Sequence, residues 1–525
     1  MTDWNFPYAT KRMPLLAANC VATTQPLAAQ AGLSMLARGG GAVDAAVAAA
    51  ITLTVVEPVM NGIGSDVFAI VAEGGRLHGL NASGRAPRAW NTERFAGRDA
   101  MPALGWDSVT VPGAVSAWAA LHGKFGRLPF EALFEPAIRY SRDGFLVTPV
   151  IAGSWRDQAA TLGRFEGFAR TFLPGGRAPI AGEPFRCPDH AETLELIAAS
   201  KGEAFYRGKL AERIVAAAEA EGGAMGLDDL AQHEADWVEP LGVEFKGYRI
   251  HELPPNGQGL AALIALGVLD RIDLGGLDPD GVEMQHLEIE ATKLGMADVR
   301  AHVGDPKTMR VRAEGLLTSA YLDERARQID RDRAIAPRPG APKPHGTVYL
   351  AAADASGTMV SLIQSNYRGF GSGIVVPGTG IAMNNRGSGF VLEEGHPNQV
   401  APRKRPMHTI IPGFATKDGA PVAAFGVMGG SMQPQGHVQV GMRMFGLGRN
   451  PQAAIDGPRW RVDGGKVMVE AAWDGEFRRG LGALGHVLED APPLQFGAAQ
   501  VIWRLPAGGY LAASESRRDG QAVGF

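Results

Sequence analysis

The sequence predicts an α+β protein with a helix-rich first part and a strand-rich last part. Apolar residues recur with helical spacing over residues 25–57 and 283–333, whereas residues 347–366 and 416–430 alternate as strands do. Between these regions, residues 334–346 (AIAPRPGAPKPHG) are rich in Pro and Gly and show no apolar period. Such a composition indicates an exposed, flexible linker. We therefore divide the chain at this linker.

Ala-rich helices open the chain. Within residues 25–57, the glycines of 37-ARGGGAVDAA-46 end one helix and precede the next. A helix stands before these glycines where a dinucleotide-binding motif requires a strand, so the cluster predicts no nucleotide site. The run 45-AAVAAAITLTVV-56 falls short of the ~20 residues of a membrane span and predicts a buried helix. Helical pattern returns over residues 190–235.

Strand pattern takes over at Thr347. Residues 347–366 predict two short strands around an Asp-Ala-Ser-Gly turn, and residues 416–430 predict a turn followed by a strand. The length of 525 residues requires either one large fold or several domains.

The composition excludes several classes of function. With 45% apolar residues, 20% charged residues and a net charge of −4, the chain is typical of a globular protein. It lacks the clustered cations that nucleic acid or an anionic membrane surface requires. The N-terminal residues 1–16 show no signal-peptide pattern, from which we expect a cytoplasmic protein.

Neither cysteines nor histidines predict a metal site or a cofactor. Cys20 and Cys187 are too few for a disulfide scaffold or a cysteine-based zinc site, and we expect buried thiols. The twelve histidines form no His-Glu-x-x-His motif, and His286 and Glu288, two residues apart, do not share a helix face.

Thr347 begins the first strand after the linker, directly behind Gly346. A threonine hydroxyl is a weak nucleophile unless a base takes its proton, and an N-terminal threonine carries that base in its own α-amine, with a pKa near ~8. This chemistry would require cleavage of the Gly346–Thr347 bond. Taken alone, Gly-Thr-Val-Tyr predicts only a strand start. His345 adjoins the bond and either assists its cleavage or is a solvated linker residue.

Motifs along nearly the whole chain favour the nucleophile over a simple strand start at Thr347. They are 38-RGGGAVDAAVA-48, 109-VTVPGAVSAW-118, 135-EPAIRYSRDGF-145, 253-LPPNGQG-259, 292-TKLGMADVRAHVGDP-306, 371-GSGIVVPGTGIAMNN-385, 403-RKRP-406 and 426-GVMGGS-431. With them the chain resembles the γ-glutamyltransferase family of N-terminal-nucleophile hydrolases. The resemblance implies a four-layer αββα sandwich that is made as one precursor chain and cut into two subunits. Residues 1–346 would be the large subunit and residues 347–525 the small subunit, intertwined in one catalytic domain. The resemblance is also compatible with an assembly in which two such pairs of subunits form a dimer.

The resemblance also implies the catalytic residues. Thr347 would be the nucleophile both for cleavage after Gly346 and for the reaction with substrate. Ser365 stands where the family has a threonine hydroxyl that orients the nucleophile. Gly429 and Gly430 match a glycine pair whose backbone N–H groups bind the oxyanion, where side chains would obstruct close approach. Without the resemblance, Gly-Gly predicts a simple turn.

The chain departs from the true transferases where these bind the α-carboxylate and α-ammonium of their substrate. An arginine of the family is absent, with Arg85 two residues beyond its place, and a Ser-Ser pair is replaced by His408 and Thr409. Two of the residues that would meet the ammonium are replaced by Tyr367 and Arg386.

These departures disfavour a γ-glutamyl substrate. Losing a charged hydrogen bond to the ammonium costs roughly 1.5–3 kcal/mol, or about 10- to 150-fold in affinity. The positive charge of Arg386 would in addition repel the substrate ammonium. A small amide that carries a carboxylate fits better, because Arg386, with Arg85 or Arg368, would hold the carboxylate through paired N–H donors. Each of these arginines is alternatively a solvated or ion-paired residue. Asn385 resembles a family residue near the site, and its alternative is a turn.

The pattern therefore resembles the branch of the family that includes oxamate amidohydrolase and certain cephalosporin acylases. We predict a threonine amidohydrolase that acts on an oxamate-like small molecule through an acyl-enzyme and needs no cofactor. The alternatives are a γ-glutamyl hydrolase or transferase, a β-lactam side-chain acylase, and an uncut binding protein without catalytic activity.

Overall fold

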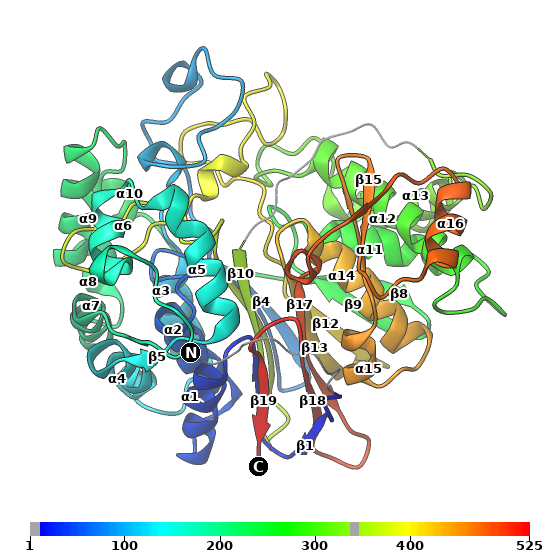
Figure 1. Ribbon diagram of the computed structural model, residues 1–525, viewed down its shortest axis with the longest axis horizontal. Coiled ribbons are helices and arrows are strands. Elements are labelled where there is room, and N and C mark those ends of the chain that lie inside the picture. Colours follow the sequence, from blue (N-terminus) through cyan, green and yellow to red (C-terminus); the bar gives the residue numbers. More distant parts are fainter. Residues whose placement is uncertain (1–10, 336–345) are drawn as a thin grey trace.

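The computed structural model describes residues 11–335 and 346–525. The N-terminal residues 1–10, most of the predicted linker and His345 lie outside the described residues. Figure 1 shows strands in the middle of the molecule, with a layer of helices on either side. This arrangement confirms the predicted αββα sandwich.

Two seven-stranded sheets form the centre of the sandwich. The first sheet, in spatial order, consists of β1 (Leu15–Ala17), β18 (Tyr510–Ser514), β17 (Ala498–Arg504), β13 (Ala420–Met428), β12 (Gly413–Lys417), β9 (Tyr248–Glu252) and β8 (Leu241–Phe245). The second sheet consists of β19 (Gln521–Gly524), β2 (Cys20–Thr23), β10 (Gly346–Ala353), β11 (Met359–Tyr367), β3 (Asp66–Glu73), β4 (Arg76–Asn81) and β7 (Asp236–Val238). The sheets pack face to face where β10 and β11 contact β13 and β17.

Helices of the first 231 residues form the layer on the left of Figure 1, and the first three of them contact strands of the second sheet. They are α1 (Pro26–Ala37), α2 (Ala42–Val56), α3 (Ala114–Phe125), α4 (Glu135–Asp143), α5 (Pro149–Leu162), α6 (Glu166–Phe172), α7 (Pro188–Ala199), α8 (Glu203–Arg207), α9 (Lys209–Ala220) and α10 (Leu227–Ala231). Both α1 and α2 follow the prediction on either side of the glycine cluster. The prediction of a buried helix at residues 45–56 is confirmed, because every residue of α2 is buried.

A second group of helices forms the layer on the right of Figure 1, on the side of the first sheet. These are α11 (Gly259–Leu269), α12 (Val282–His302), α13 (Ser319–Ala326), α14 (Met432–Gly441), α15 (Pro451–Asp456) and α16 (Gly475–Ala483). Short sheets accompany the helices: β14 (Trp460–Asp463), β15 (Lys466–Val469) and β16 (Leu488–Asp490) on this side, and β5 (Phe145–Leu146) with β6 (Pro184–Phe185) on the other.

The parts before and after the linker share the sandwich, and each supplies both helices and strands to it. The predicted strands around the Asp-Ala-Ser-Gly turn are β10 and β11, and residues 416–430 contain β13. However, the part before the linker also supplies strands to both sheets, and the part after it supplies α14, α15 and α16. The strand β3 is buried along almost its whole length because both faces of the sheet are covered there, so its sequence shows little alternation.

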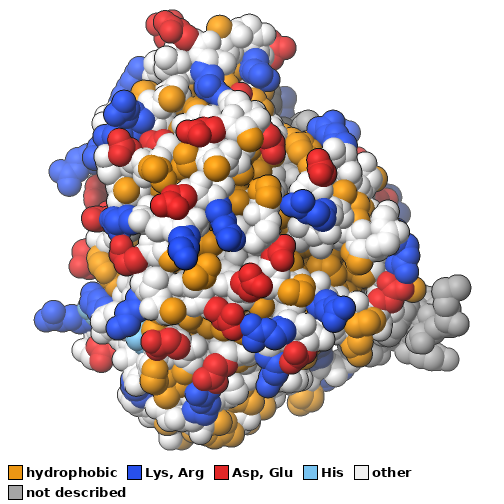
Figure 2. Space-filling model, turned by 90° about the vertical axis from the view of Figure 1, so that its left-hand side faces the viewer, with side chains coloured by type: hydrophobic (Ala, Val, Ile, Leu, Met, Phe, Trp, Pro, Cys, Tyr) orange, Lys and Arg blue, Asp and Glu red, His pale blue; other side chains and the backbone are white. Residues whose placement is uncertain are grey.

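Within residues 11–335 and 346–525, no helix has the combination of length and apolarity that crossing a membrane requires. Acidic and basic side chains are interspersed over the face shown in Figure 2. Cys20 and Cys187 are both buried free thiols, as predicted, and burial raises the pKa of the Cys187 thiol to about 11.

Candidate active site

Thr347 lies where ends of several central strands meet. The chain is continuous from Gly346 into Thr347, and β10 pairs with the end of β11 through a register shift between Gly346 and Val348. The neighbouring strand β3 begins beside Ser365, with Asp66 as the residue opposite it. Thr347 is fully buried. In the continuous chain, its hydroxyl is therefore closed off from solvent.

Two side chains orient the hydroxyl of Thr347. It donates a hydrogen bond to Ser365 Oγ at 3.3 Å, and it accepts one from Gln433 Nε2 at 3.3 Å. The structure thus brings Ser365 to the predicted position. Gln433 did not figure among the sequence-predicted residues; it lies in the first turn of α14, 86 residues from Thr347.

The glycine pair ends β13 close to this point. Gly429 and Gly430 have φ angles of +125° and +63°, a backbone region that residues with a Cβ rarely adopt. The backbone N–H of Gln433 donates to the Gly430 carbonyl, while the Gln433 side chain donates to Thr347. Gln258 holds the same Gly430 carbonyl at 2.7 Å. The pair is therefore linked to the Thr347 hydroxyl through Gln433.

Arg386 joins the same cluster from the loop after β11. Its Nη1 donates to Thr409 Oγ1 at 2.9 Å and its Nη2 donates to Ser365 Oγ at 3.4 Å. The guanidinium carbon lies 4.1 Å from the centre of the Tyr367 ring, a cation–π distance. Burial lowers the pKa of the Arg386 guanidinium to about 10, with Asp66 opposing the shift, so it stays protonated at neutral pH. The structure thereby brings Arg386, Ser365, Tyr367 and Thr409 together, all of which were singled out from the sequence.

Tyr367 adopts a strained backbone conformation in this cluster. Its φ of +80° is uncommon for a residue other than glycine, and a bulky aromatic side chain makes it less favourable still. The Tyr367 N–H donates to Ser365 Oγ at 2.8 Å, and its ring lies under Arg386. Residues held in such conformations concentrate at functional sites, which supports a role for this turn.

Asp66 is the anion of the cluster, and sequence reasoning missed it. Its Oδ2 lies 3.0 Å from His408 Nε2 and 3.8 Å from Arg386 Nε, and its Oδ1 accepts from the Gly84 N–H at 3.0 Å. Burial and the Arg386 charge lower the pKa of His408 to about 4. His408 is therefore neutral at pH 7 and donates from Nε2 to Asp66, while its Nδ1 accepts from the Ile410 N–H.

Asn385 and Arg85 lie apart from the contacts around Thr347. Asn385 donates to the Ala103 carbonyl at 2.8 Å and accepts from the Arg368 N–H at 3.0 Å, so it shapes the loop that carries Arg386. Arg85 pairs with Asp305 at 3.3 Å and with Asp236 at 3.8 Å. Its side chain lines a separate cavity of about 220 Å³ together with Ala86, Val111, Asp229, Gln232, His233, Lys307 and Arg403. The two arginines, Arg85 and Arg386, therefore do not converge on one point in this structure.

Comparison with known proteins agrees with this geometry. The family model described as "Gamma-glutamyltranspeptidase" matches residues 28–525. The chain is 36% identical to the "Glutathione hydrolase-like YwrD proenzyme" of Bacillus subtilis, over 95% of this chain and 97% of that protein. It is 37% identical to the "Oxamate amidohydrolase proenzyme" of Klebsiella pneumoniae, over the same shares of the two chains.

A solved structure extends the similarity to three dimensions. The cephalosporin acylase from Bacillus halodurans superposes with a TM-score of 0.96 at 47% identity, covering 100% of this chain and 99% of that chain. The chain therefore belongs to the γ-glutamyltranspeptidase family and is an N-terminal-nucleophile enzyme that hydrolyses an amide bond or transfers its acyl group.

Proposed function

We propose that this protein cuts its own chain before Thr347 and then hydrolyses an amide of a small, carboxylate-bearing molecule similar to oxamate. The observation that carries the substrate class is the position of Arg386. Its guanidinium donates to Ser365 Oγ, the same oxygen to which the Thr347 hydroxyl donates. A substrate carboxylate beside the nucleophile would thus meet a fixed positive charge.

The cutting step rearranges one peptide bond. Thr347 Oγ1 attacks the Gly346 carbonyl carbon, its proton passes to the Thr347 nitrogen as the C–N bond breaks, and an ester with a free α-amine on Thr347 results. Water then hydrolyses the ester, which leaves a carboxylate on Gly346 and restores the hydroxyl. Residues 1–346 become the large subunit and residues 347–525 the small subunit.

The second reaction uses the new α-amine as the base. It takes the proton of the Thr347 hydroxyl while Oγ1 attacks the substrate carbonyl, and the backbone N–H groups of Gly429 and Gly430 stabilise the oxyanion. Collapse releases ammonia or an amine that carries away the proton. Water hydrolyses the remaining acyl-enzyme. Gln433 and Ser365 orient Oγ1 throughout, as the hydrogen bonds to Thr347 indicate.

A second candidate is a β-lactam side-chain acylase. The observation in its favour is the 47% identity to the cephalosporin acylase from Bacillus halodurans. The relatives named for glutathione hydrolysis keep a γ-glutamyl substrate as a third candidate. All three candidates require the same nucleophile and differ in the acyl group.

The experiment that tests the proposal compares wild-type protein with Thr347→Ala by intact mass under denaturing conditions. We expect two fragments that end at Gly346 and begin at Thr347 in the wild type, and one uncut chain in the variant. The cut protein is then offered oxamate, a γ-glutamyl amide and a cephalosporin with an amide side chain at equal concentrations. We expect oxamate to give the highest kcat/KM.

Each result has a definite meaning. A single chain in both proteins after prolonged incubation would contradict the proposed role of Thr347 as nucleophile and favour an uncut binding protein. Cutting followed by faster turnover of the γ-glutamyl amide or the cephalosporin would leave the nucleophile standing and overturn the substrate class.

A further inference from the structure

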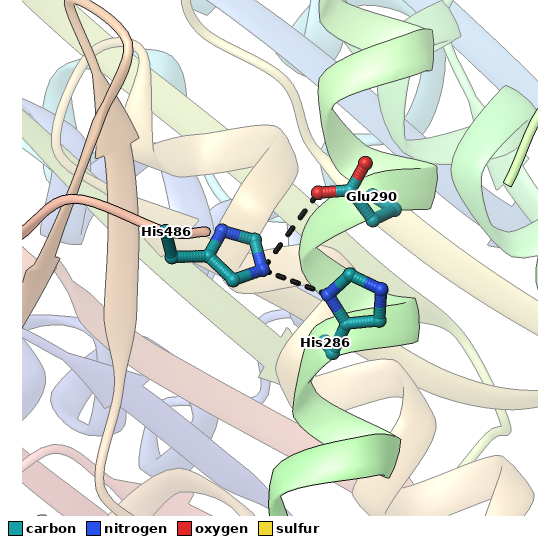
Figure 3. Close-up of side chains that lie close together, drawn as sticks. All are labelled: His286, Glu290 and His486. Atoms are coloured by element: carbon teal, nitrogen blue, oxygen red, sulfur yellow. Dashed lines mark hydrogen bonds and ion pairs between the residues drawn. The ribbon is translucent and has the colours of Figure 1, made fainter. Parts of the chain in front are cut away.

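Two histidines and a glutamate meet among the helices that cover the first sheet. His286 and Glu290 lie one turn apart on α12, and His486 follows α16. Figure 3 shows the three side chains converging from these two segments. One nitrogen or oxygen of each lies within 4.8 Å of the others, and all three side chains are buried. The residues are separate from those around Thr347.

The hydrogen bonds leave ligand atoms facing one another. His286 Nε2 lies 2.8 Å from the Asp330 carbonyl, to which only an N–H can donate. This bond places the lone pair of a neutral His286 on Nδ1, which faces His486 Nε2 at 2.8 Å. A ligating histidine is commonly oriented in this way, by donating its other N–H to a carbonyl.

His486 can present Nε2 without breaking a bond at its other nitrogen. Among the described residues, His486 Nδ1 is buried and has no hydrogen-bond partner. The ring can therefore carry its proton on Nδ1 and turn the Nε2 lone pair toward His286 and Glu290.

Glu290 supplies the negative charge. Its Oε1 lies 3.8 Å from His486 Nε2, and the same oxygen accepts from Lys293 Nζ at 2.7 Å. Its Oε2 accepts from the Ile335 N–H at 2.8 Å. A carboxylate oxygen has two lone pairs, so Oε1 retains capacity for a metal, while Lys293 competes with any cation for this carboxylate.

We propose that His286 Nδ1, His486 Nε2 and Glu290 Oε1 bind a divalent transition metal such as Zn²⁺. Two imidazoles and one carboxylate suit Zn²⁺, Co²⁺ and Ni²⁺ better than Mg²⁺ or Ca²⁺, which prefer oxygen ligands alone. Ligand atoms at Zn²⁺ distances stand about 3.3 Å apart in tetrahedral geometry. His486 Nε2 lies 2.8 Å from His286 Nδ1 and 3.8 Å from Glu290 Oε1, one distance shorter and the other longer than this value.

A metal at this position would connect the parts of the chain before and after the proposed cleavage. His286 and Glu290 belong to the part before the proposed cleavage, and His486 belongs to the part after it. The cluster also holds the chain that leads to the linker, because His286 contacts the Asp330 carbonyl and Glu290 accepts from the Ile335 N–H. The neighbouring Lys293 donates to the Ile335 carbonyl. Bridging of two subunits rests on the proposed cleavage, whereas metal binding itself does not.

The test uses the purified full-length protein, freed of metal by chelation and then titrated with Co²⁺ and with Zn²⁺. We expect one Zn²⁺ per chain by elemental analysis and a visible absorption of tetrahedral Co²⁺. His486→Ala should lose both signals. His302→Ala, at the end of the same helix and outside the cluster, should retain them. Thr347→Ala should also retain them, so failure of self-cleavage and failure of metal binding are distinguishable.

A further variant tests the competition with Lys293. Lys293→Met should bind Zn²⁺ more tightly than wild type, and its melting temperature should rise more on addition of Zn²⁺. Absence of bound metal in both wild type and Lys293→Met would overturn the proposal. Equal stoichiometry in wild type and His486→Ala would overturn it too, because the metal would then lie elsewhere.

Discussion

Arg386 places a fully buried positive charge beside Ser365 and Thr347, and the Asp66 carboxylate lies 3.8 Å from its Nε. A buried ion that loses its partner is strongly destabilising, whereas a buried pair costs less than either ion alone. Asp66 therefore lowers the free-energy cost of burying the Arg386 charge in the folded protein. His408 shares Asp66 as a hydrogen-bond acceptor and remains neutral, so the cluster carries one positive and one negative charge.

The substitution Arg386→Gln tests the role of this charge in substrate choice. Losing a charged hydrogen bond to a carboxylate should raise KM for oxamate by about 10- to 150-fold, from roughly 1.5–3 kcal/mol. The KM of a neutral small amide should change little. Steady-state kinetics on the two substrates measure this difference. Because Arg386→Gln removes the positive charge that faces the Asp66 carboxylate, the double variant with Asp66→Asn serves as a stability control. An equal loss for both substrates would contradict the carboxylate role.

Part of this cluster was predictable from the sequence once the family resemblance was included. Thr347 stands at the start of a strand behind a linker, and the family resemblance identified Ser365 and Arg386. Asp66 and Gln433 were not predictable, because they reach the site through pairings between segments that are distant in the chain.

At the scale of elements, helices were easier to predict than strands. The two helices around the glycine cluster have capping and Gly signals that act locally, and α1 and α2 lie where these signals indicate. The strand β3 is buried along almost its whole length and contacts α3, so its apolar run lacks alternation and cannot be told from a buried helix by its period. This explains why a strand of the central sheet escaped prediction.

The helix α7 carries a buried histidine that makes stability depend on pH. His190 lies 3.2 Å from Thr54 Oγ1 of α2 and 3.3 Å from the Gly380 carbonyl. Burial lowers the pKa of His190 from 6.5 to about 4. Between these two values the unfolded chain binds a proton that the folded protein does not, so stability falls as the pH falls through this window.

We expect His190→Gln to be less sensitive to acid than wild type. The histidine should contribute a loss of about 3 kcal/mol in the free energy of unfolding as the pH falls from the unfolded to the folded pKa, and glutamine has no proton to bind. Urea unfolding at a series of pH values measures the slope for both proteins. Parallel profiles across this window would show that His190 does not titrate as its burial indicates.

At the scale of the whole molecule, the parts before and after the linker are interleaved in both sheets. In the second sheet, β10 from the later part pairs with β2 from the earlier part, and β11 pairs with β3. In the first sheet, β12 pairs with β9 in the same way. Neither part has a complete sheet of its own, so the resemblance-based prediction of two subunits within one domain fits this topology.

This interleaving predicts that the two fragments stay together after cleavage. Separating them would expose the backbone groups of strand pairs in both sheets and the apolar faces between the sheets, each of which is costly to leave unsatisfied or exposed. We expect the cut protein to elute in size-exclusion chromatography as one species containing both fragments, and to unfold in a single thermal transition. Denaturing electrophoresis of the same fraction should show two bands. Elution of either fragment alone under native conditions would contradict the prediction, because a half-sheet core would then be stable without its partner.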